Sequence, residues 1–326
     1  MKDWRYVLAE HRGTLLAVAI FVLMFAIYAG NHPAGFTANV VTTASNKGVL
    51  LAFVAIAQTL VVITAGIDLS VGMIFVLTNC LASWLCYGSP LETALGVAAV
   101  LATGLVCGAI NGLVVIYGRL QPIVTTIATG AIYFGIALAL RPVPGGEVNT
   151  TLADALTGRI FGVIPASLVT LLAVVVVIWV PFSRSAIGRA AYATGSSETA
   201  AYMSGLPIRR ARLAAYTLAG LLASIGGLFL TFFTYSGEAS AANGNTYTLY
   251  SIAAVVLGGV SLFGGTGSAI GAIFGALAFR TIGDLLFVFD LEPLWQPLFQ
   301  GVVLLAAVCF GAFRLLNVRN RLDYFG

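Results

Sequence analysis

The feature that most constrains this chain is a succession of long apolar runs that carry almost no charge. Windows of about 20 apolar residues, the length that a helix needs to cross a bilayer, recur along the whole sequence. These runs are continuous rather than alternating, which favours helices over a β-barrel. We therefore predict an all-α polytopic membrane protein with a single transmembrane domain over residues 1–326. The ten expected crossings lie near residues 14–30, 46–65, 69–86, 93–117, 122–140, 166–182, 212–235, 246–263, 268–284 and 294–313.

The few charged residues, 9% of the chain against about 25% in soluble proteins, indicate its orientation. With ten crossings and a cytoplasmic N-terminus, twelve Lys and Arg residues fall inside, whereas only Lys47, Arg141 and Arg159 fall outside. If residues 46–86 entered and left by the same face, the arginines of 184–212 would move outside. We therefore predict cytoplasmic N- and C-termini. The long cytoplasmic loop is then 183–211, and the outer loops are 31–45, 141–165 and 236–246.

One carboxylate, Asp68, lies between the second and third expected crossings. Gly66 and Gly72 flank it, so the backbone can bend there. Asp68 is placed to cap a helix that begins near Leu69, by accepting an N–H group such as that of Ser70. Two interpretations stay open, a helix cap alone or a break on a transport path, because intramembrane carboxylates are costly and usually functional. Whether the bend lies inside the membrane also stays open. The candidate path and gating residues are Gly66, Asp68, Ser70, Gly72, Asn79, Asn111, Thr125 and Thr126.

Two crossings carry a glycine at every fourth position. Each such stripe predicts a flat helix face that a neighbouring backbone can approach closely. A glycine-rich bend at 257–268 adjoins the second stripe and corresponds to the bend at Gly66, which leaves an internal repeat open. The helix-packing glycines are Gly104, Gly108 and Gly112 in one stripe and Gly267, Gly271 and Gly275 in the other.

The loop at 183–211 contains the signals of one short helix. Ser197 offers an N-cap, Glu198 suits the first turn, and Gly205 and Pro207 end the helix after two turns at most. A free helix of that length would not persist in water. The alternatives are a solvated linker and a helix that docks on another protein through a small apolar surface. That surface would consist of Ala200, Ala201, Tyr202 and Met203.

Several kinds of chemistry have no motif in this chain. There is no G-x-x-x-x-G-K-[ST] phosphate loop, no H-E-x-x-H and no G-x-S-x-G, and the four cysteines form no C-x-x-C. We expect no catalysis by this subunit, no metal site and no cofactor bound by it. Energy for transport would then come from a partner.

Four motifs in order along the chain resemble one family. Ala65-Gly-Ile-Asp-Leu-Ser-Val-Gly72 is similar to the G-G-[IV]-D-L-S-V-G signature of permease subunits of ribose- and xylose-type ABC sugar importers, with Ala65 where Gly is common. These subunits form a branch of the branched-chain amino acid and sugar permease family. Three further stretches, 120–129, 192–205 and 252–271, are similar to other motifs of this family, with Ser197 where Asn is usual.

The resemblance implies a type II ABC importer-like permease in the bacterial inner membrane. It would translocate a monosaccharide or related polyol by alternating access, with ATP and Mg²⁺ bound by a cytoplasmic ABC ATPase. The implied partners are that ATPase, a periplasmic sugar-binding protein received by the outer loops, a second permease that is identical or homologous, and the lipid bilayer, but no nucleic acid. The residues implied to contact the ATPase are Gly195, Ser197, Glu198, Ala200, Ala201, Ser204 and Gly205.

Two alternatives differ in substrate or in energy source. One is a branched-chain amino acid or nucleoside permease of the same family. The other is a proton-coupled secondary carrier that uses Asp68, which predicts uptake by this chain alone in vesicles with a pH gradient.

Overall fold

The described part of the chain is a bundle of helices. The computed structural model describes residues 12–306 and 309. The only strands among these residues form one β-hairpin, in which each strand has two residues. The elements are α2 (Arg12–Asn31), α3 (Ala38–Val62), α4 (Val71–Leu85), α5 (Pro90–Tyr117), α6 (Pro122–Leu140), α7 (Thr150–Thr157), β1 (Arg159–Ile160), β2 (Ile164–Pro165), α8 (Ala166–Val174), η1 (Val175–Trp179), α9 (Val180–Arg184), α10 (Ala186–Ser196), α11 (Glu198–Met203), α12 (Ile208–Thr234), α13 (Ala241–Leu257), α14 (Ala269–Val288) and η2 (Pro293–Trp295), followed by a helix at Gln296–Ala306.

The expected membrane helices are present, and the all-α polytopic fold is confirmed. Within residues 12–306, seven helices are long and apolar enough to cross a membrane. They are α2, α3, α5, α6, the continuous segment Ala166–Arg184, α12 and α14. Two other expected crossings are shorter helices, α4 with 15 residues and α13 with 17. The last expected crossing, 294–313, extends beyond the residues that the structure describes.

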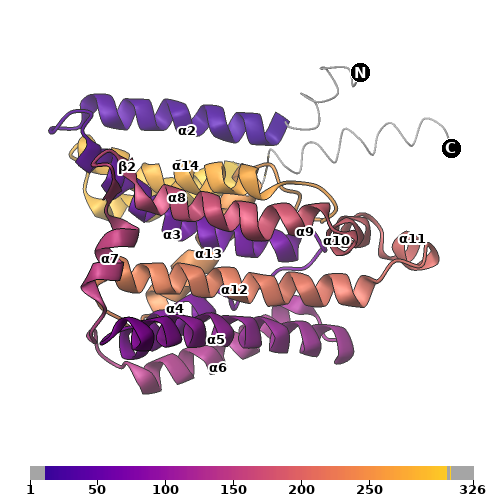
Figure 1. Cartoon of the computed structure of the whole chain (residues 1–326). Helices are drawn as coiled ribbons and strands as arrows, with labels where there is room; N and C mark the ends of the chain where they lie inside the picture. Colours follow the sequence, from indigo (N-terminus) through magenta and orange to yellow (C-terminus); the bar gives the residue numbers. More distant parts are fainter. Residues whose placement is uncertain (1–11, 307–308, 310–326) are drawn as a thin grey trace.

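The helices run side by side, and the connecting elements gather at the two ends of the bundle (Figure 1). α10 and α11 lie at one end, which we call the α11 end, whereas α7 and the β1–β2 hairpin lie at the opposite end. The loops that the charge pattern assigned to the cytoplasm and to the outside are therefore separated in space. The loop helices are more extensive than expected, because α10 precedes α11 and α7 occupies part of the outer loop.

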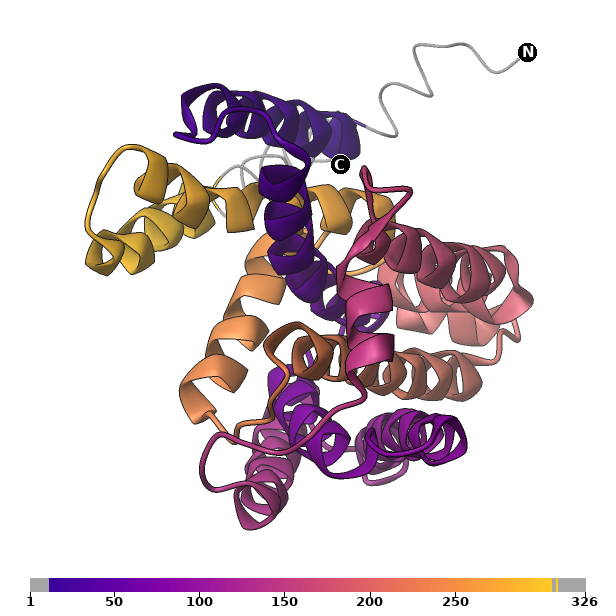
Figure 2. The ribbon, with the colours of Figure 1, turned by 60° about the vertical axis from the view of Figure 1, so that its left-hand side comes forward.

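α3 forms the centre of the bundle. Every residue from Gly48 to Thr64 is buried, as expected for a helix that is apolar on all sides. α12 packs against α3, α4 and α5, and α14 packs against α2, α3 and α13. α2 lies at the periphery, with only Ala17, Tyr28 and Ala29 buried (Figure 2). The core therefore forms mainly from residues after α2.

The first glycine stripe lies where α5 crosses α12. A Cβ atom at Gly104 would lie 2.4 Å from the Ser224 side chain, and one at Gly108 would lie 2.3 Å from the Tyr216 carbonyl oxygen. Gly220 of α12 faces back, since a Cβ there would lie 2.1 Å from the Gly104 carbonyl oxygen. Gly112 is less crowded, with its nearest neighbour at 3.0 Å. The two backbones are therefore in direct contact.

The second stripe is only partly helical, which corrects the expectation. Gly271 and Gly275 lie in α14, where added Cβ atoms would lie 2.2 Å from the Gly258 carbonyl oxygen and 2.1 Å from that of Ala254. Gly267 precedes the helix, because Ser268 is its N-cap. The φ angle of Gly267 is +124°, which favours glycine and places it in the bend instead.

Candidate functional site

Asp68 is the centre of a buried polar cluster in the bend between α3 and α4. Its Oδ1 accepts hydrogen bonds from the Ser70 backbone N–H at 2.8 Å and from the Ser70 hydroxyl at 2.6 Å. The Asn111 side-chain amide donates to the Ser70 Oγ at 2.7 Å and to Asp68 Oδ2 at 3.4 Å. The Tyr133 hydroxyl lies 3.0 Å from Asn111 Oδ1. Asp68, Ser70 and Asn111 are all buried, so this cluster satisfies polar groups that cannot reach water.

The cluster also fixes the start of α4, two residues later than expected. α4 begins at Val71 with Ser70 as its N-cap, so Asp68 supports the cap residue instead of being the cap. Two threonines from other helices bind neighbouring N–H groups. The Leu69 N–H donates to Thr126 Oγ1 at 2.9 Å, and the Gly72 N–H donates to Thr248 Oγ1 at 3.1 Å.

The bend between α3 and α4 lies inside the helical bundle, because Asp68 and Ser70 are completely buried by protein. α5 ends at Tyr117, close to the α11 end, and Asn111 lies about 9 Å of helix rise before that residue. Because Asn111 is hydrogen-bonded to Asp68, Asp68 lies at a similar distance from the α11 end. α4 is correspondingly short, about 22 Å for its 15 residues against about 30 Å of hydrocarbon. A polar bend surrounded by protein is the tolerated form of irregular backbone at membrane depth.

Five of the predicted path residues meet in this cluster, and the others lie apart. Gly66 lies beside Tyr216, since a Cβ there would lie 3.0 Å from the tyrosine hydroxyl. Thr125 is buried, and its hydroxyl has no hydrogen-bond partner among the described residues. Asn79 lies in a separate contact, where its amide donates to Thr231 Oγ1 at 2.8 Å and accepts from the Glu238 N–H at 2.9 Å. The five that meet are Asp68, Ser70, Gly72, Asn111 and Thr126.

Three loop segments converge between this cluster and α11, at a contact that we call the junction. The Gly265 N–H, from the bend after α13, donates to the Ile63 carbonyl oxygen at 3.0 Å. Gly195 fits against both, because a Cβ there would lie 2.0 Å from that oxygen and 2.5 Å from the Gly265 nitrogen. The Tyr192 hydroxyl donates to the Gly267 carbonyl oxygen at 2.7 Å, and burial raises the pKa of Tyr192 to about 12. The loop that carries α11 is thereby joined to both interrupted segments.

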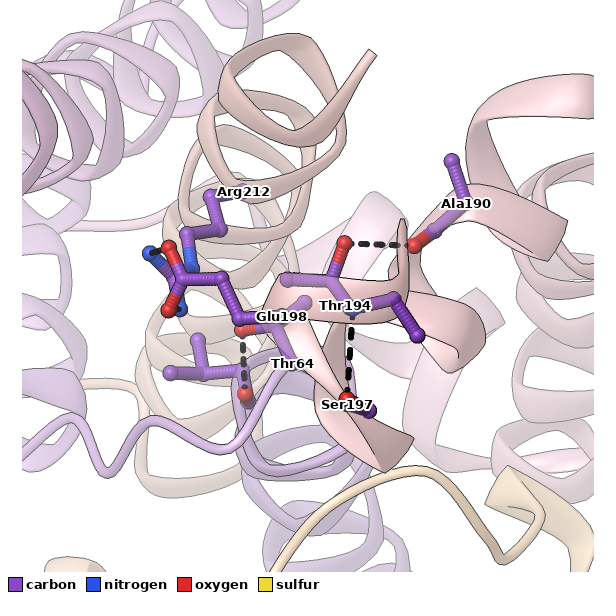
Figure 3. Close-up of polar contacts among 8 residues, drawn as sticks. Thr64, Ala190, Thr194, Ser197, Glu198 and Arg212 are labelled. Atoms are coloured by element: carbon purple, nitrogen blue, oxygen red, sulfur yellow. Dashed lines mark hydrogen bonds and ion pairs between the residues drawn. The ribbon is translucent and has the colours of Figure 1, made fainter. Parts of the chain in front are cut away.

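α11 itself has the caps that its sequence predicts. The Ser197 hydroxyl accepts from the Ala200 N–H, and the Gly205 N–H bonds back to the Tyr202 carbonyl with a φ angle of +68°. The carboxylate of Glu198 faces the guanidinium group of Arg212 at the start of α12 (Figure 3), in two hydrogen bonds of 2.9 and 2.8 Å. The six-residue helix is therefore held to the bundle by an ion pair.

The apolar surface of α11 divides into a buried part and an exposed part. Ala201 is buried against the bundle, whereas Tyr202 and Met203 are 76% and 82% exposed. Ala200 and Ser204 lie on the same short helix and its end and are exposed as well. The described chain leaves this surface open to another molecule.

Two contacts at the end opposite α11 were not predicted. Lys47 of α3 pairs with Asp284 of α14 at 3.3 Å, with side chains that are 35% and 9% exposed. Two outer loops are joined by backbone hydrogen bonds between Gly145 and Gly237. Asp284 is an isolated carboxylate at the end of an apolar run, and such a residue indicates a charged partner nearby. The identity of that partner, Lys47, could not be inferred from the sequence.

Comparisons with known proteins identify close sequence relatives. The ribose import permease protein RbsC of Escherichia coli (strain K12) is 33% identical over 298 residues, which cover 89% of this chain and 91% of that protein. The fructose import permease protein FrcC of Rhizobium meliloti is 32% identical over 303 residues, covering 90% and 84%. The probable ABC transporter permease protein y4mJ of Sinorhizobium fredii is 33% identical over 307 residues, covering 92% and 90%. No solved structure matches the chain.

The apolar helical bundle, with seven helices of membrane-spanning length among the described residues, defines a multi-pass membrane protein. Residues 40–308 match the family described as branched-chain amino acid transport system / permease component, and the chain belongs to this family. The resemblance inferred from the four motifs is therefore confirmed. The chain is a permease, which moves a solute across a membrane, and is not an enzyme.

Proposed function

We propose that this chain is the permease subunit of an ABC importer that translocates a monosaccharide or related polyol. The relatives that support the sugar class are permeases whose names specify ribose and fructose, at 33% and 32% identity over most of the chain. Hydroxyl and amide groups, such as those of Ser70, Asn111 and Thr126, suit a neutral polyhydroxy solute. The bend that holds them is a candidate gate on its path.

The partners in this proposal are a cytoplasmic ABC ATPase, a periplasmic sugar-binding protein and a second permease, identical or homologous. ATP and Mg²⁺ bind to the ATPase and not to this chain. Lipid covers the exposed apolar faces of helices such as α5 and α6. The α11 end faces the cytoplasm, as do both termini, in the inner membrane. The arginines of 184–212 at that end support this orientation.

The observation that carries the mechanism is the junction of Gly195, Ile63 and Gly265. The ATPase contacts the exposed residues of α11, and Gly195 lies just before the cap of this helix. A displacement of α11 would press on the Ile63 carbonyl and on the bend after α13, because Gly195 leaves no free space there. Both interrupted segments would then shift together, which is a means of switching the path between its two openings.

The burial and the hydrogen bonds of the Asp68 carboxylate support a structural role for this residue in the mechanism. It is completely buried, and both of its oxygens accept hydrogen bonds from Ser70 or Asn111. We therefore do not propose proton coupling through Asp68. The carboxylate holds the bend in shape while the segments around it move.

Reconstitution tests the proposal directly. The chain would be assembled in liposomes with the ATPase and binding protein of the same source, and uptake of labelled ribose and fructose would be measured. We expect uptake only with ATP and both partners. Uptake by the chain alone under a pH gradient would contradict the proposal, as would ATP-driven uptake of leucine but of no sugar.

A further inference from the structure

A cavity at the α11 end is not explained by the proposed path. It has a volume of about 770 Å³ and is bordered by α5, α6, α11, α12 and the bend after α3. This volume lies within the range of about 300–1,000 Å³ that is usual for small-molecule sites. Glu198 and Tyr202 of α11 form part of its wall. A ligand held there would therefore touch both the docking helix and the bundle.

The wall of this cavity is strongly basic. It contains four arginines, Arg119, Arg209, Arg210 and Arg212, and a single carboxylate, that of Glu198. Glu198 is already engaged by Arg212 in two hydrogen bonds. Among the described residues, the other three arginines have no acidic partner. Arg209 lies over the Tyr117 ring at 6.0 Å, and Arg119 and Arg210 border the cavity without a counter-ion from the described chain.

Two further observations indicate a ligand that accepts hydrogen bonds. Tyr216 borders the cavity, is only 1% exposed, and its hydroxyl has no hydrogen-bond partner in the described chain. A buried polar group without a partner is costly, so an acceptor that entered from the cavity and reached this closed-off hydroxyl would remove that cost. In addition, α12 begins in the cavity wall at Pro207 and Ile208 without a side-chain cap. The Ile208 N–H already donates to the Leu206 carbonyl oxygen, but the N–H groups of Arg209 and Arg210 and the helix dipole favour an anion.

We propose that this cavity binds a phosphate group, carried either by a small cytoplasmic phosphate ester or by the headgroup of an anionic phospholipid. Phosphate fits the wall because guanidinium groups bind its oxygens through paired hydrogen bonds. The inference rests on the proposed function only in placing the α11 end in the cytoplasm. Binding to the cavity itself requires neither the ATPase nor transport.

Titration of the purified full-length chain tests this site. The chain would be placed in nanodiscs of phosphatidylcholine and titrated with inorganic phosphate and pyrophosphate by calorimetry, with chloride at the same ionic strength as control. The variants are Arg119→Ala, Arg210→Ala and Tyr216→Phe. The matched control is Arg184→Ala, an exposed arginine of the same loop region outside the cavity. Thermal melting would verify that each variant is folded.

We expect either phosphate probe to bind and Arg119→Ala and Arg210→Ala each to weaken binding by roughly tenfold. Tyr216→Phe should weaken it less, and Arg184→Ala should leave it unchanged. Equal losses in all the arginine variants would overturn the proposal, because they would reflect general charge alone. Binding that survives in both cavity arginine variants would overturn it too.

A lipid arm distinguishes the two sources of phosphate. Nanodiscs in which phosphatidylglycerol replaces part of the phosphatidylcholine should raise the melting temperature of the parent chain, but not that of Arg119→Ala, if a headgroup occupies the cavity. Such a rise without binding of soluble phosphate assigns the site to lipid. Absence of both responses in the folded parent chain would refute the site. Because no uptake is measured, failure here leaves the proposed transport function standing.

Discussion

The Gly265 N–H donates to the Ile63 carbonyl oxygen at 3.0 Å, which joins the bend after α13 to the bend after α3. The two bends come from different halves of the chain, yet they form one contact beside the loop that carries α11. We therefore expect movement of one bend to involve the other. This makes the junction the first place to test the proposed mechanism.

Substitution of Gly195 by Ala tests whether the junction couples the segments. The added Cβ would lie 2.0 Å from the Ile63 carbonyl oxygen, so the backbone must shift. We expect a loss of about 1–3 kcal/mol in stability and a larger fractional loss of ATP-driven uptake. Gly135→Ala is the control, because nothing lies within 4 Å of a Cβ at that position in α6. Unchanged uptake in the Gly195 variant would remove the junction from the mechanism.

Two substitutions of Asp68 should distinguish the contribution of its hydrogen bonds from that of its negative charge. Asp68→Leu leaves the Ser70 N–H and the Asn111 amide short of acceptors, at a cost of about 1–3 kcal/mol for each buried group. Asp68→Asn keeps an oxygen that can accept from Ser70. We expect the Leu variant to lose more melting temperature and more uptake than the Asn variant. Normal uptake by both would show that the cluster does not contribute to transport.

The ion pair between Glu198 and Arg212 should affect coupling more than folding. Their side chains are 57% and 27% exposed, so the pair stabilises the chain by no more than about 1 kcal/mol. We expect Glu198→Arg to lower the sugar transported per ATP hydrolysed while the melting temperature stays nearly constant. Adding Arg212→Glu restores the pair in reverse and should recover part of the coupling. Normal coupling in Glu198→Arg would exclude this contact from energy transfer.

The pair of Lys47 and Asp284 should be important for stability because Asp284 is nearly buried, while Lys47 is 35% exposed. Lys47→Met leaves the carboxylate of Asp284, only 9% exposed, without its cation. Removing one partner of a buried pair is more harmful than removing both. We therefore expect the double variant with Asp284→Leu to melt higher than Lys47→Met alone. A double variant less stable than the single one would show that the two charges act independently.

Local signals in the sequence predicted local structure well. The cap at Ser197 and the stop at Gly205 defined α11, because both depend on residues only a few positions apart. The stripe at Gly108 predicted a close helix contact but not its partner α12, since spacing on one helix carries no information about another. Gly267 was misassigned because its spacing matches a helix, whereas its φ angle depends on the bend.

The contacts of the site could be predicted only in part. Asp68 and Asn111 were both identified as candidates by the cost of polar groups in hydrocarbon. Their hydrogen bond joins residues far apart in the chain, and that pairing is set by how the helices pack. Tyr216 carried no signal at all, because an aromatic residue in an apolar helix is most often an ordinary core residue. That its hydroxyl has no partner among the described residues is evident only in the folded chain.

The contact between α5 and α12 has a mechanical consequence. Gly104, Gly108 and Gly220 bring the two backbones so close that sliding or rotation would force carbonyl groups into each other. We therefore expect these two helices to move as one rigid body during turnover. Spin labels placed on the exposed surfaces of α5 and α12 would keep a constant separation. The conformational change would then take place at other helix interfaces, where the backbones are not in direct contact.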